Sequence, residues 1–305
     1  MNQRTISLRT WVDMILLALI WGAIFLVIEF ALKELTPFWA VAHRVFWAAP
    51  VLWFVVYARG RAMPRAASAW AGFFVMGALN NAIPFSLITW GQTEIESGLA
   101  SILNGTTAFF GMVVAAAFLA DERLTARKSI GVVLGVIGVA IIMGLDALGG
   151  LDPRALGQLA ILGAAISYAF AGVWARLRLT GMKPEIAAAG MLTCSAGQML
   201  AIALVAEGPP LLALTTTTIG AIAYMSLLGT AAAYLLFYRI LASAGSGNLM
   251  LVTVVMPPIS VLLGWAVLGE RLSATDLIGC ALILIGLMIV DGKLLKWVAG
   301  RKRQA

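Results

Sequence analysis

The chain has 305 residues, of which 62% are hydrophobic and only 11% charged, and its mean hydropathy is +0.98. Soluble domains have about 45–50% apolar and about 25% charged residues, so this composition excludes a soluble fold. The formal net charge of +7 comes from cations that lie between apolar runs rather than in one basic patch, which argues against nucleic acid as a partner. The two cysteines, Cys194 and Cys280, fall inside apolar runs and lack a metal-binding spacing.

Ten apolar runs are long enough for transmembrane helices, since a helix needs about 20 mostly apolar residues to cross a hydrocarbon layer of roughly 30 Å. The first run begins near Trp11 and is too long for a signal-peptide core, so we expect a retained helix. Turn-forming residues such as Thr36-Pro37 and Gly149-Gly150 separate the runs. The sequence therefore predicts an all-α membrane protein. Its spans are expected at approximately 11–32, 38–57, 68–90, 97–119, 127–145, 155–175, 185–206, 218–241, 247–268 and 275–292.

The distribution of basic residues predicts on which side of the membrane each end of the chain lies. Cytoplasmic loops of membrane proteins carry an excess of Lys and Arg. With the N-terminus in the cytoplasm, 17 of the 21 Lys and Arg residues fall on the cytoplasmic side, and the opposite orientation reverses this bias. We therefore expect both termini in the cytoplasm. The basic segment 293–305 is then a cytoplasmic tail that anchors the topology or, alternatively, binds lipid headgroups.

A repeated motif divides the chain into two halves. Eleven identical residues recur at a spacing of 148 positions, most of them around Glu122-Arg123-Leu124 and Glu270-Arg271-Leu272. Arg127-Lys128 of the first copy is replaced by Thr275-Asp276 in the second. Five spans in each half place the second copy upside down in the membrane, and the loss of two cations fits a loop on the outer side. Inverted repeats are typical of secondary transporters. The two predicted five-helix repeats span 11–145 and 155–292.

Polar side chains inside spans are the first candidates for a binding site, because lipid offers them no hydrogen bonds. The second span contains the sole histidine, His43, next to Arg44. An arginine at membrane depth costs about 2.5–3.5 kcal/mol on insertion scales, so Arg44 is expected to have a partner or contact with water. The pair either packs against other helices, with Glu29 or backbone carbonyls as partner, or contacts the solute or an outer gate.

Prolines inside the third and ninth spans predict local breaks in the helices. Asn80 and Pro84 share one face of the third span, and Pro257 and Pro258 lie in the ninth. A proline frees a backbone carbonyl, which inside a membrane must line protein or a cavity. These prolines are therefore candidate hinge or kink residues, and the alternative is a kink that only serves packing. Asn104 on the fourth span either contacts the solute or forms an interhelical hydrogen bond.

Aromatic side chains complete the expected cavity. Trp21 lies about ten residues into the first span, away from the headgroup layer that Trp prefers. Tyr224 and Tyr234 share one face of the eighth span if it is a regular α-helix. With Phe25 and Tyr168 they either form a wall for flat or aromatic solutes or simply pack. The expected substrate-binding residues are Trp21, Phe25, His43, Arg44, Asn80, Pro84, Asn104, Tyr168, Tyr224 and Tyr234.

The repeated Glu-Arg-Leu motif, together with Trp21-Gly22, Arg44 and Met256-Pro257-Pro258, resembles the EamA family of the drug/metabolite transporter superfamily over approximately 11–292. The resemblance implies ten helices in two inverted halves and export of amino acids or metabolites. The aromatic-rich spans, with His43 and Asn80-Asn81-Ala82-Ile83-Pro84, look most like the YddG-type aromatic amino-acid exporters. The first half has Asn104-Gly105-Thr106-Thr107 where the family commonly has a proline, which departs from a symmetric two-proline cavity.

These observations predict a multi-pass exporter in the bacterial inner membrane rather than an enzyme. We expect export of amino acids, in particular aromatic ones, and related metabolites by alternating access. Acidic residues are missing from the centres of the predicted spans, which favours facilitated diffusion, and the alternative is a proton-coupled exporter of drugs or other small metabolites. No catalytic motif such as H-E-x-x-H occurs in the sequence.

Partners and assembly follow from the same features. A small-molecule solute and membrane lipid are the expected partners, without nucleic acid, cofactor or metal. Glycines on the fifth and tenth spans permit close helix approach, either within one chain or between two copies. We therefore expect a monomer or a weak homodimer. These glycines are Gly131, Gly135, Gly138, Gly279 and Gly286.

Overall fold

All described elements of the chain are helices. The computed structural model describes residues 7–144 and 152–291, and these ranges contain no strand. Three segments, marked η, are π-helices, whose hydrogen bonds join residues five apart. The elements are α1 (Leu8–Leu32), α2 (Pro37–Ala58), α3 (Ala67–Gly77), η1 (Ala78–Ala82), α4 (Ile83–Gly91), α5 (Ser97–Asn104), α6 (Thr107–Phe118), α7 (Ala126–Met143), α8 (Pro153–Arg178), α9 (Pro184–Glu207), α10 (Thr216–Ala223), η3 (Tyr224–Ala232), α11 (Ala233–Ala244), α12 (Ser246–Leu263), η4 (Gly264–Leu268) and α13 (Ala274–Asp291).

Nine helical stretches of the described chain are long and apolar enough to cross a membrane, and a tenth, Ala274–Val290, is shorter but also apolar. Some stretches combine several elements, as α3, η1 and α4 do in Ala67–Gly91. The prediction of an all-α protein with multiple membrane spans is therefore confirmed. Arg4, Gly149-Gly150 and the basic tail 293–305 lie outside the described residues.

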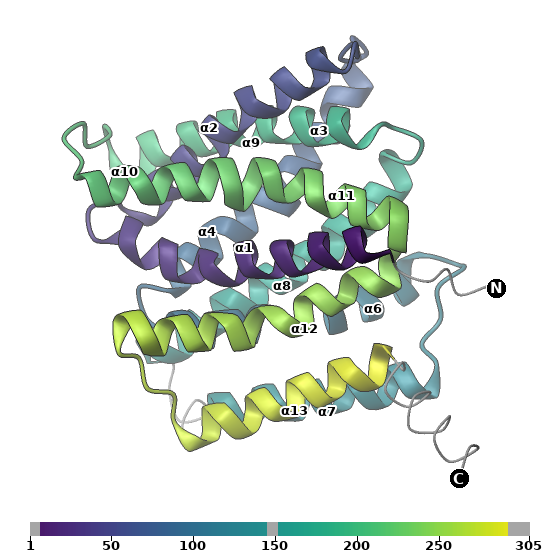
Figure 1. The fold of residues 1–305 in the computed structure, drawn as a ribbon, viewed down its shortest axis with the longest axis vertical. Coiled ribbons are helices and arrows are strands. Elements are labelled where there is room, and N and C mark those ends of the chain that lie inside the picture. The colour runs from purple at the N-terminus through teal and green to yellow at the C-terminus, as the bar shows by residue number, and fades with distance from the viewer. Residues whose placement is uncertain (1–6, 145–151, 292–305) are drawn as a thin grey trace.

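The helices lie side by side, and their ends form two opposite faces of the bundle (Figure 1). The stretch Ser97–Phe118 is one span, so Ser97 lies at one face and Glu122, just after Phe118, lies at the other. We refer to these faces as the Glu270 end, which contains Glu270 and Ser97, and the Glu122 end, which contains Glu122 and Arg176. The core between them contains fully buried side chains such as Leu17, Leu52 and Met199.

Close packing between α7 and α13, which lie together along one edge of the bundle in Figure 1, depends on glycines. A Cβ atom on Gly138 would lie 2.7 Å from the carbonyl oxygen of Gly279, and one on Gly131 would lie 2.7 Å from that of Gly286. Both distances are shorter than van der Waals contact, so larger residues would force the helices apart. The glycines therefore serve packing within the chain, which is the first of the two alternatives. A contact between two copies stays a prediction.

The two proline segments differ in their local structure. The π-helix η1 ends directly before Ile83-Pro84, where the proline cannot donate an amide hydrogen bond. By contrast, α12 continues as an α-helix through Pro257 and Pro258, and the departure from α-helical geometry comes later, in η4. A change from π-helical to α-helical hydrogen bonding thus accompanies the proline of the third span, and the helix itself is continuous. The role of any of these prolines as a hinge stays a prediction.

Candidate functional site

The Arg44 side chain of α2 lies in the interior of the bundle. It is 6% exposed, its Nε donates a hydrogen bond to Thr230 Oγ1 of η3 at 3.0 Å, and its guanidinium carbon lies 3.6 Å from the centre of the Phe85 ring. Within the described part of the chain, no Asp or Glu carboxylate forms an ion pair with Arg44. A buried charge without a counter-ion is unfavourable, and a bound anion would offset that cost. The Arg44 side chain is therefore a buried cation that can accept an anionic partner.

A series of hydrogen bonds near Arg44 joins η1, α9 and α11. Asn80 Nδ2 donates to the Tyr234 hydroxyl at 2.9 Å, and this hydroxyl donates to Asn81 Oδ1 at 2.5 Å. Asn81 Nδ2 in turn donates to Ser195 Oγ at 2.9 Å. Tyr234 also lies within electrostatic range of Arg44. Because connected polar groups inside a protein orient one another, the network fixes several donors and acceptors beside the buried cation.

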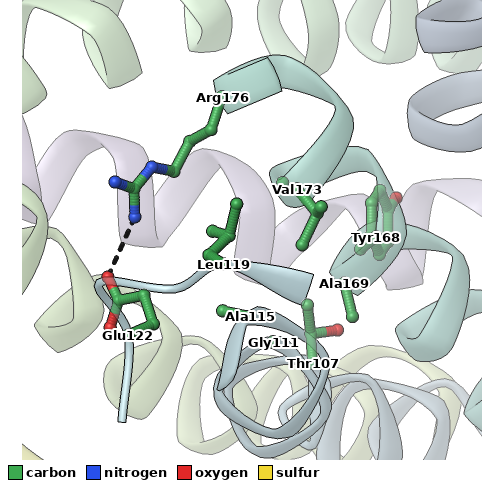
Figure 2. Close-up of a pocket in the computed structure, with 10 residues that line it drawn as sticks. Thr107, Gly111, Ala115, Leu119, Glu122, Tyr168, Ala169, Val173 and Arg176 are labelled. Atoms are coloured by element: carbon green, nitrogen blue, oxygen red, sulfur yellow. Dashed lines mark hydrogen bonds and ion pairs between the residues drawn. The ribbon is translucent and has the colours of Figure 1, made fainter. Parts of the chain in front are cut away.

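A cleft with a volume of about 240 Å³ runs between α6 and α8 from the Glu122 end of the bundle. Figure 2 shows Arg176 of α8 and Glu122 facing each other at one side of the cleft, with Tyr168 and Thr107 at the other. The Arg176 Nη1 and Glu122 Oε1 atoms are 3.1 Å apart. Tyr168, at the inner part of the cleft, is near enough to Arg44 for an electrostatic interaction, whereas Arg44 does not itself line the cleft. The lining residues are Thr107, Gly111, Ala115, Leu119, Glu122, Tyr168, Ala169, Gly172, Val173 and Arg176.

The structure brings together part of the predicted site. Asn80 and Tyr234 share a hydrogen bond, and Tyr234 and Tyr168 are both near enough to Arg44 for an electrostatic interaction. Pro84 is buried directly before Phe85, whose ring covers the guanidinium of Arg44. A proline that ends a π-helix therefore positions the aromatic ring against the cation.

Three predicted aromatic residues have other surroundings. Trp21 donates a hydrogen bond to a carbonyl of η3 at 3.2 Å, and the Tyr224 hydroxyl donates to a carbonyl of α1 at 3.1 Å, so both join α1 to η3. Phe25 is 2% exposed and belongs to the core. Tyr224 and Tyr234 have different partners because the π-helix η3 interrupts the regular rotation on which their shared face was predicted.

His43 and Arg44 have different neighbours although they are adjacent. His43 Nδ1 accepts a hydrogen bond from Trp47 Nε1 at 3.3 Å, and its ring lies 6.0 Å from that of Trp39. Trp47 is 49% exposed, so this side of α2 faces outward. Successive residues of an α-helix point about 100° apart, which turns His43 away from the arginine. A contact between His43 and the solute stays a prediction.

Asn104, the last residue of α5, has a buried Oδ1 atom without a hydrogen-bond partner among the described residues. Buried polar atoms are normally satisfied. The amide thus offers a free acceptor for a solute, and its role in binding stays a prediction.

Sequence reasoning did not select Thr230, Phe85 or Asn81 as site residues. Thr230 lies in η3, whose π-helical geometry has no signal in the sequence, and Phe85 is one of many aromatic residues in apolar runs. Asn81 was visible as part of the motif before Pro84. Across the ranges 7–144 and 152–291, no three His, Cys, Asp or Glu side chains form a cluster that could hold a metal ion.

A bundle of membrane spans with a cleft that leads to a buried polar centre is the architecture of a membrane transporter. The EamA-like transporter family matches this chain twice, over residues 11–144 and 155–290. The chain therefore belongs to the EamA family of transporters. The family-level resemblance found in the sequence is confirmed.

Several named transporters are similar to this chain over nearly its whole length. The uncharacterized transporter YoaV of Bacillus subtilis is 22% identical over 282 residues, which is 92% of this chain and 96% of YoaV. A probable amino-acid metabolite efflux pump of Salmonella typhimurium is 26% identical and covers 90% of this chain and 92% of its own. The uncharacterized inner membrane transporter YedA of Escherichia coli is 25% identical, over 90% of this chain and 88% of its own.

A protein of known crystal structure has the same fold. It superposes with a TM-score of 0.66 over 92% of this chain and 96% of its own, at 20% sequence identity.

Proposed function

We propose that this protein exports amino acids and related metabolites across the bacterial inner membrane, and that Arg44 binds the carboxylate of the solute. The proposal rests on the buried guanidinium of Arg44, which has a hydroxyl and an aromatic ring as neighbours but no carboxylate partner in the described ranges. Hydrogen bonds between Arg and a carboxylate are among the strongest in proteins. The Salmonella relative, named as a probable amino-acid metabolite efflux pump, supports the same class of solute.

Aromatic amino acids are the proposed solutes within this class. Phe85 lies against Arg44, and Tyr168 and Tyr234 lie within electrostatic range of it. Aromatic rings attract other rings in offset or edge-to-face arrangements, so a side chain such as that of Phe or Trp would gain contacts beside the carboxylate site. The likeness to YddG-type exporters supports the same choice.

The proposed mechanism is alternating access between two inverted five-helix halves, 11–145 and 155–292, with both termini in the cytoplasm. The duplicated Glu-Arg-Leu motif and the bias of Lys and Arg support this arrangement. YedA is named an inner membrane transporter, which supports the same location for this chain. We propose facilitated diffusion down the gradient of the solute as the mode of transport.

Flux measurements in proteoliposomes test the proposal. We expect saturable flux of labelled Phe or Trp by the wild type, and at least about a tenfold loss in Arg44→Ala, because a tenfold change corresponds to about 1.4 kcal/mol and a lost charged contact costs more. Arg44→Lys should recover only part of the flux, since Lys cannot form the paired hydrogen bonds of a guanidinium. Arg271→Ala, which removes an exposed arginine outside the spans, is the matched control. The absence of saturable flux of any amino acid would contradict the proposed function.

A proton-coupled exporter of drugs or other small metabolites is the alternative. Glu29 favours it, because this carboxylate lies within the first span and its Oε1 accepts a hydrogen bond from Gln92 Nε2 at 2.7 Å. Transporters commonly use such a carboxylate as a proton relay. Under this alternative, an uncoupler abolishes uphill flux and Glu29→Gln uncouples it. Under facilitated diffusion, neither change affects downhill flux.

A further inference from the structure

The cleft between α6 and α8 extends far into the bundle. Its lining residues on α6 run from Thr107 to Leu119, and those on α8 run from Tyr168 to Arg176. At about 1.5 Å per residue, the α6 side covers about 18 Å along the helix axis. The hydrocarbon layer of a membrane is roughly 30 Å thick. The cleft therefore reaches from the Glu122 end to about the middle of the membrane, the depth at which transporters bind their solutes.

The chemistry of the cleft changes along its length. Arg176 and Glu122 form an ion pair at the mouth, where their side chains are 48% and 37% exposed. Ala115, Leu119 and Val173 then give apolar walls. Hydroxyl groups of Thr107 and Tyr168 follow at the inner part, and Tyr168 interacts electrostatically with the buried Arg44. A charged mouth, an apolar passage and a buried cation suit a solute that has both an anionic group and an apolar part.

The size of the cleft limits what can pass. Its volume is about 240 Å³, whereas pockets for drug-sized ligands have roughly 300–1,000 Å³. The space is therefore large enough for a small metabolite.

Two glycines create the open space of the cleft without a role in helix packing. A Cβ atom on Gly111 or on Gly172 would meet no atom within 4 Å. By comparison, a Cβ atom on Gly135 would lie 2.2 Å from the ring of Phe109. A methyl group added at either cleft position would therefore project into open space and leave the contacts between helices in place.

We propose that this cleft is the passage by which an anionic, partly apolar metabolite moves between the Glu122 end and Arg44, and that Gly111 and Gly172 keep it open. The proposal rests on the function proposed above and adds the route. With the cytoplasmic orientation predicted from the basic residues, the solute enters the exporter here. The ion pair of Arg176 and Glu122 stands at the opening.

The first test fills the cleft and measures flux of labelled Phe and Trp in proteoliposomes. We expect Gly172→Leu and Gly111→Leu to reduce flux at least tenfold, and Gly172→Ala to reduce it less, because the larger side chain occupies more of the passage. Gly197→Leu is the matched control, since Gly197 is also an exposed helix residue whose Cβ would meet no atom within 4 Å, but it lies outside the cleft. Leucine forms helices better than glycine, so folding should be retained. Normal flux in both cleft variants would overturn the proposal.

The second test does not depend on knowing the solute. Gly172→Cys and Ala115→Cys are made in a Cys194→Ala, Cys280→Ala background and treated with a charged, membrane-impermeant maleimide from each side of the vesicle membrane. We expect reaction from one side only, the side from which the exposed loop variant Lys183→Cys reacts, because a solute passage contains water. Reaction only with a lipid-soluble maleimide would mean that lipid chains fill the cleft, and would overturn the proposal.

The two tests separate failure of the route from failure of the function. If the wild type transports amino acids but the filled variants do so equally well, the route is wrong and the function stands. If the wild type transports no amino acid, the proposed function is wrong. The one-sided reaction of the cysteine variants then still shows whether the cleft is filled with water.

Discussion

The two copies of the Glu-Arg-Leu motif make different contacts, although their sequences are nearly the same. Glu270 Oε1 accepts a hydrogen bond from the backbone N–H of Ser97 at 2.9 Å, and its Oε2 accepts from that of Gly98 at 3.1 Å. Its carboxylate thus caps the first turn of α5, where unpaired amide groups favour a negative charge. Glu122 instead pairs with the exposed side chain of Arg176 at 3.1 Å and with the partly exposed side chain of Lys128 at 3.5 Å.

The residues that follow the motif also make more contacts in the second copy than in the first. In the second copy, the Ser273 N–H donates to Asp276 Oδ2 at 2.9 Å while the Asp276 N–H donates to Ser273 Oγ at 3.1 Å, which is a reciprocal cap at the start of α13. In the first copy Lys128 takes the place of the aspartate, so Thr125 caps α7 from one side only.

The difference shows that the same motif is held more firmly at the Glu270 end than at the Glu122 end. At the Glu270 end a buried carboxylate network joins helices, since Asp276 is 2% exposed and also pairs with Arg154 at 3.4 Å. At the Glu122 end the corresponding contacts are ion pairs between partly exposed side chains, which contribute little to stability. The open side of the bundle is the one whose motif makes the weaker contacts.

The largest effect should come from exchanging the residues at the equivalent positions 128 and 276. Asp276→Lys removes the reciprocal cap and puts a second cation beside Arg154, which should lower the free energy of unfolding by about 2–4 kcal/mol. Lys128→Asp should change it far less, because the new side chain lies among partly exposed groups and can complete the cap with Thr125. The unfolding midpoint in detergent measures both. Equal losses of stability in the two variants would show that positions 128 and 276 contribute equally to stability.

A smaller effect is expected for the motif glutamates themselves. Glu270→Gln keeps the size of the side chain but removes the charge that accepts two amide hydrogen bonds, and it should cost about 1–3 kcal/mol of stability. Glu122→Gln, the matched change, should leave the unfolding midpoint nearly unchanged. The rate at which the Gly172→Cys variant reacts with the impermeant maleimide is an independent measurement. Loss of contacts at the Glu270 end should change the fraction of molecules in which the cleft is open, and therefore this rate. A larger loss of stability in Glu122→Gln than in Glu270→Gln would contradict the comparison.

The smallest effect is a pH dependence at the Glu122 end. A hydrogen bond from Arg176 holds the pKa of Asp121 below its ordinary value. A carboxylate with a lowered pKa contributes stability above its unfolded pKa, about 3.9, and this contribution is lost as the pH falls through the folded value. We therefore expect the unfolding midpoint to decrease slightly below about pH 4. Asp121→Asn should remove this component, so an unchanged pH profile in that variant would disprove the assignment.

Much of the fold could be predicted because its signals are local. The predicted span 275–292 corresponds to α13 (Ala274–Asp291), and the span 38–57 to α2 (Pro37–Ala58). Apolar runs of sufficient length and turn-forming residues between them define such helices without any tertiary contact. A partner for Arg44 inside the bundle was also predictable, since the cost of a charge at membrane depth can be read from the sequence.

The rest depended on which helices meet. No local pattern marks η3 as a π-helix, so neither the contact of Thr230 with Arg44 nor the separate partners of Tyr224 and Tyr234 could be predicted. The different contacts of Glu122 and Glu270 could not be predicted either. The two copies have the same motif, and they differ in which helix end lies within reach of the glutamate side chain. The sequence by itself determined the membrane-spanning helices, the family and the buried cation, all of which follow from composition and short motifs. The tertiary structure alone decided which side chains surround that cation and where a cleft reaches it, because these depend on contacts between residues far apart in the chain.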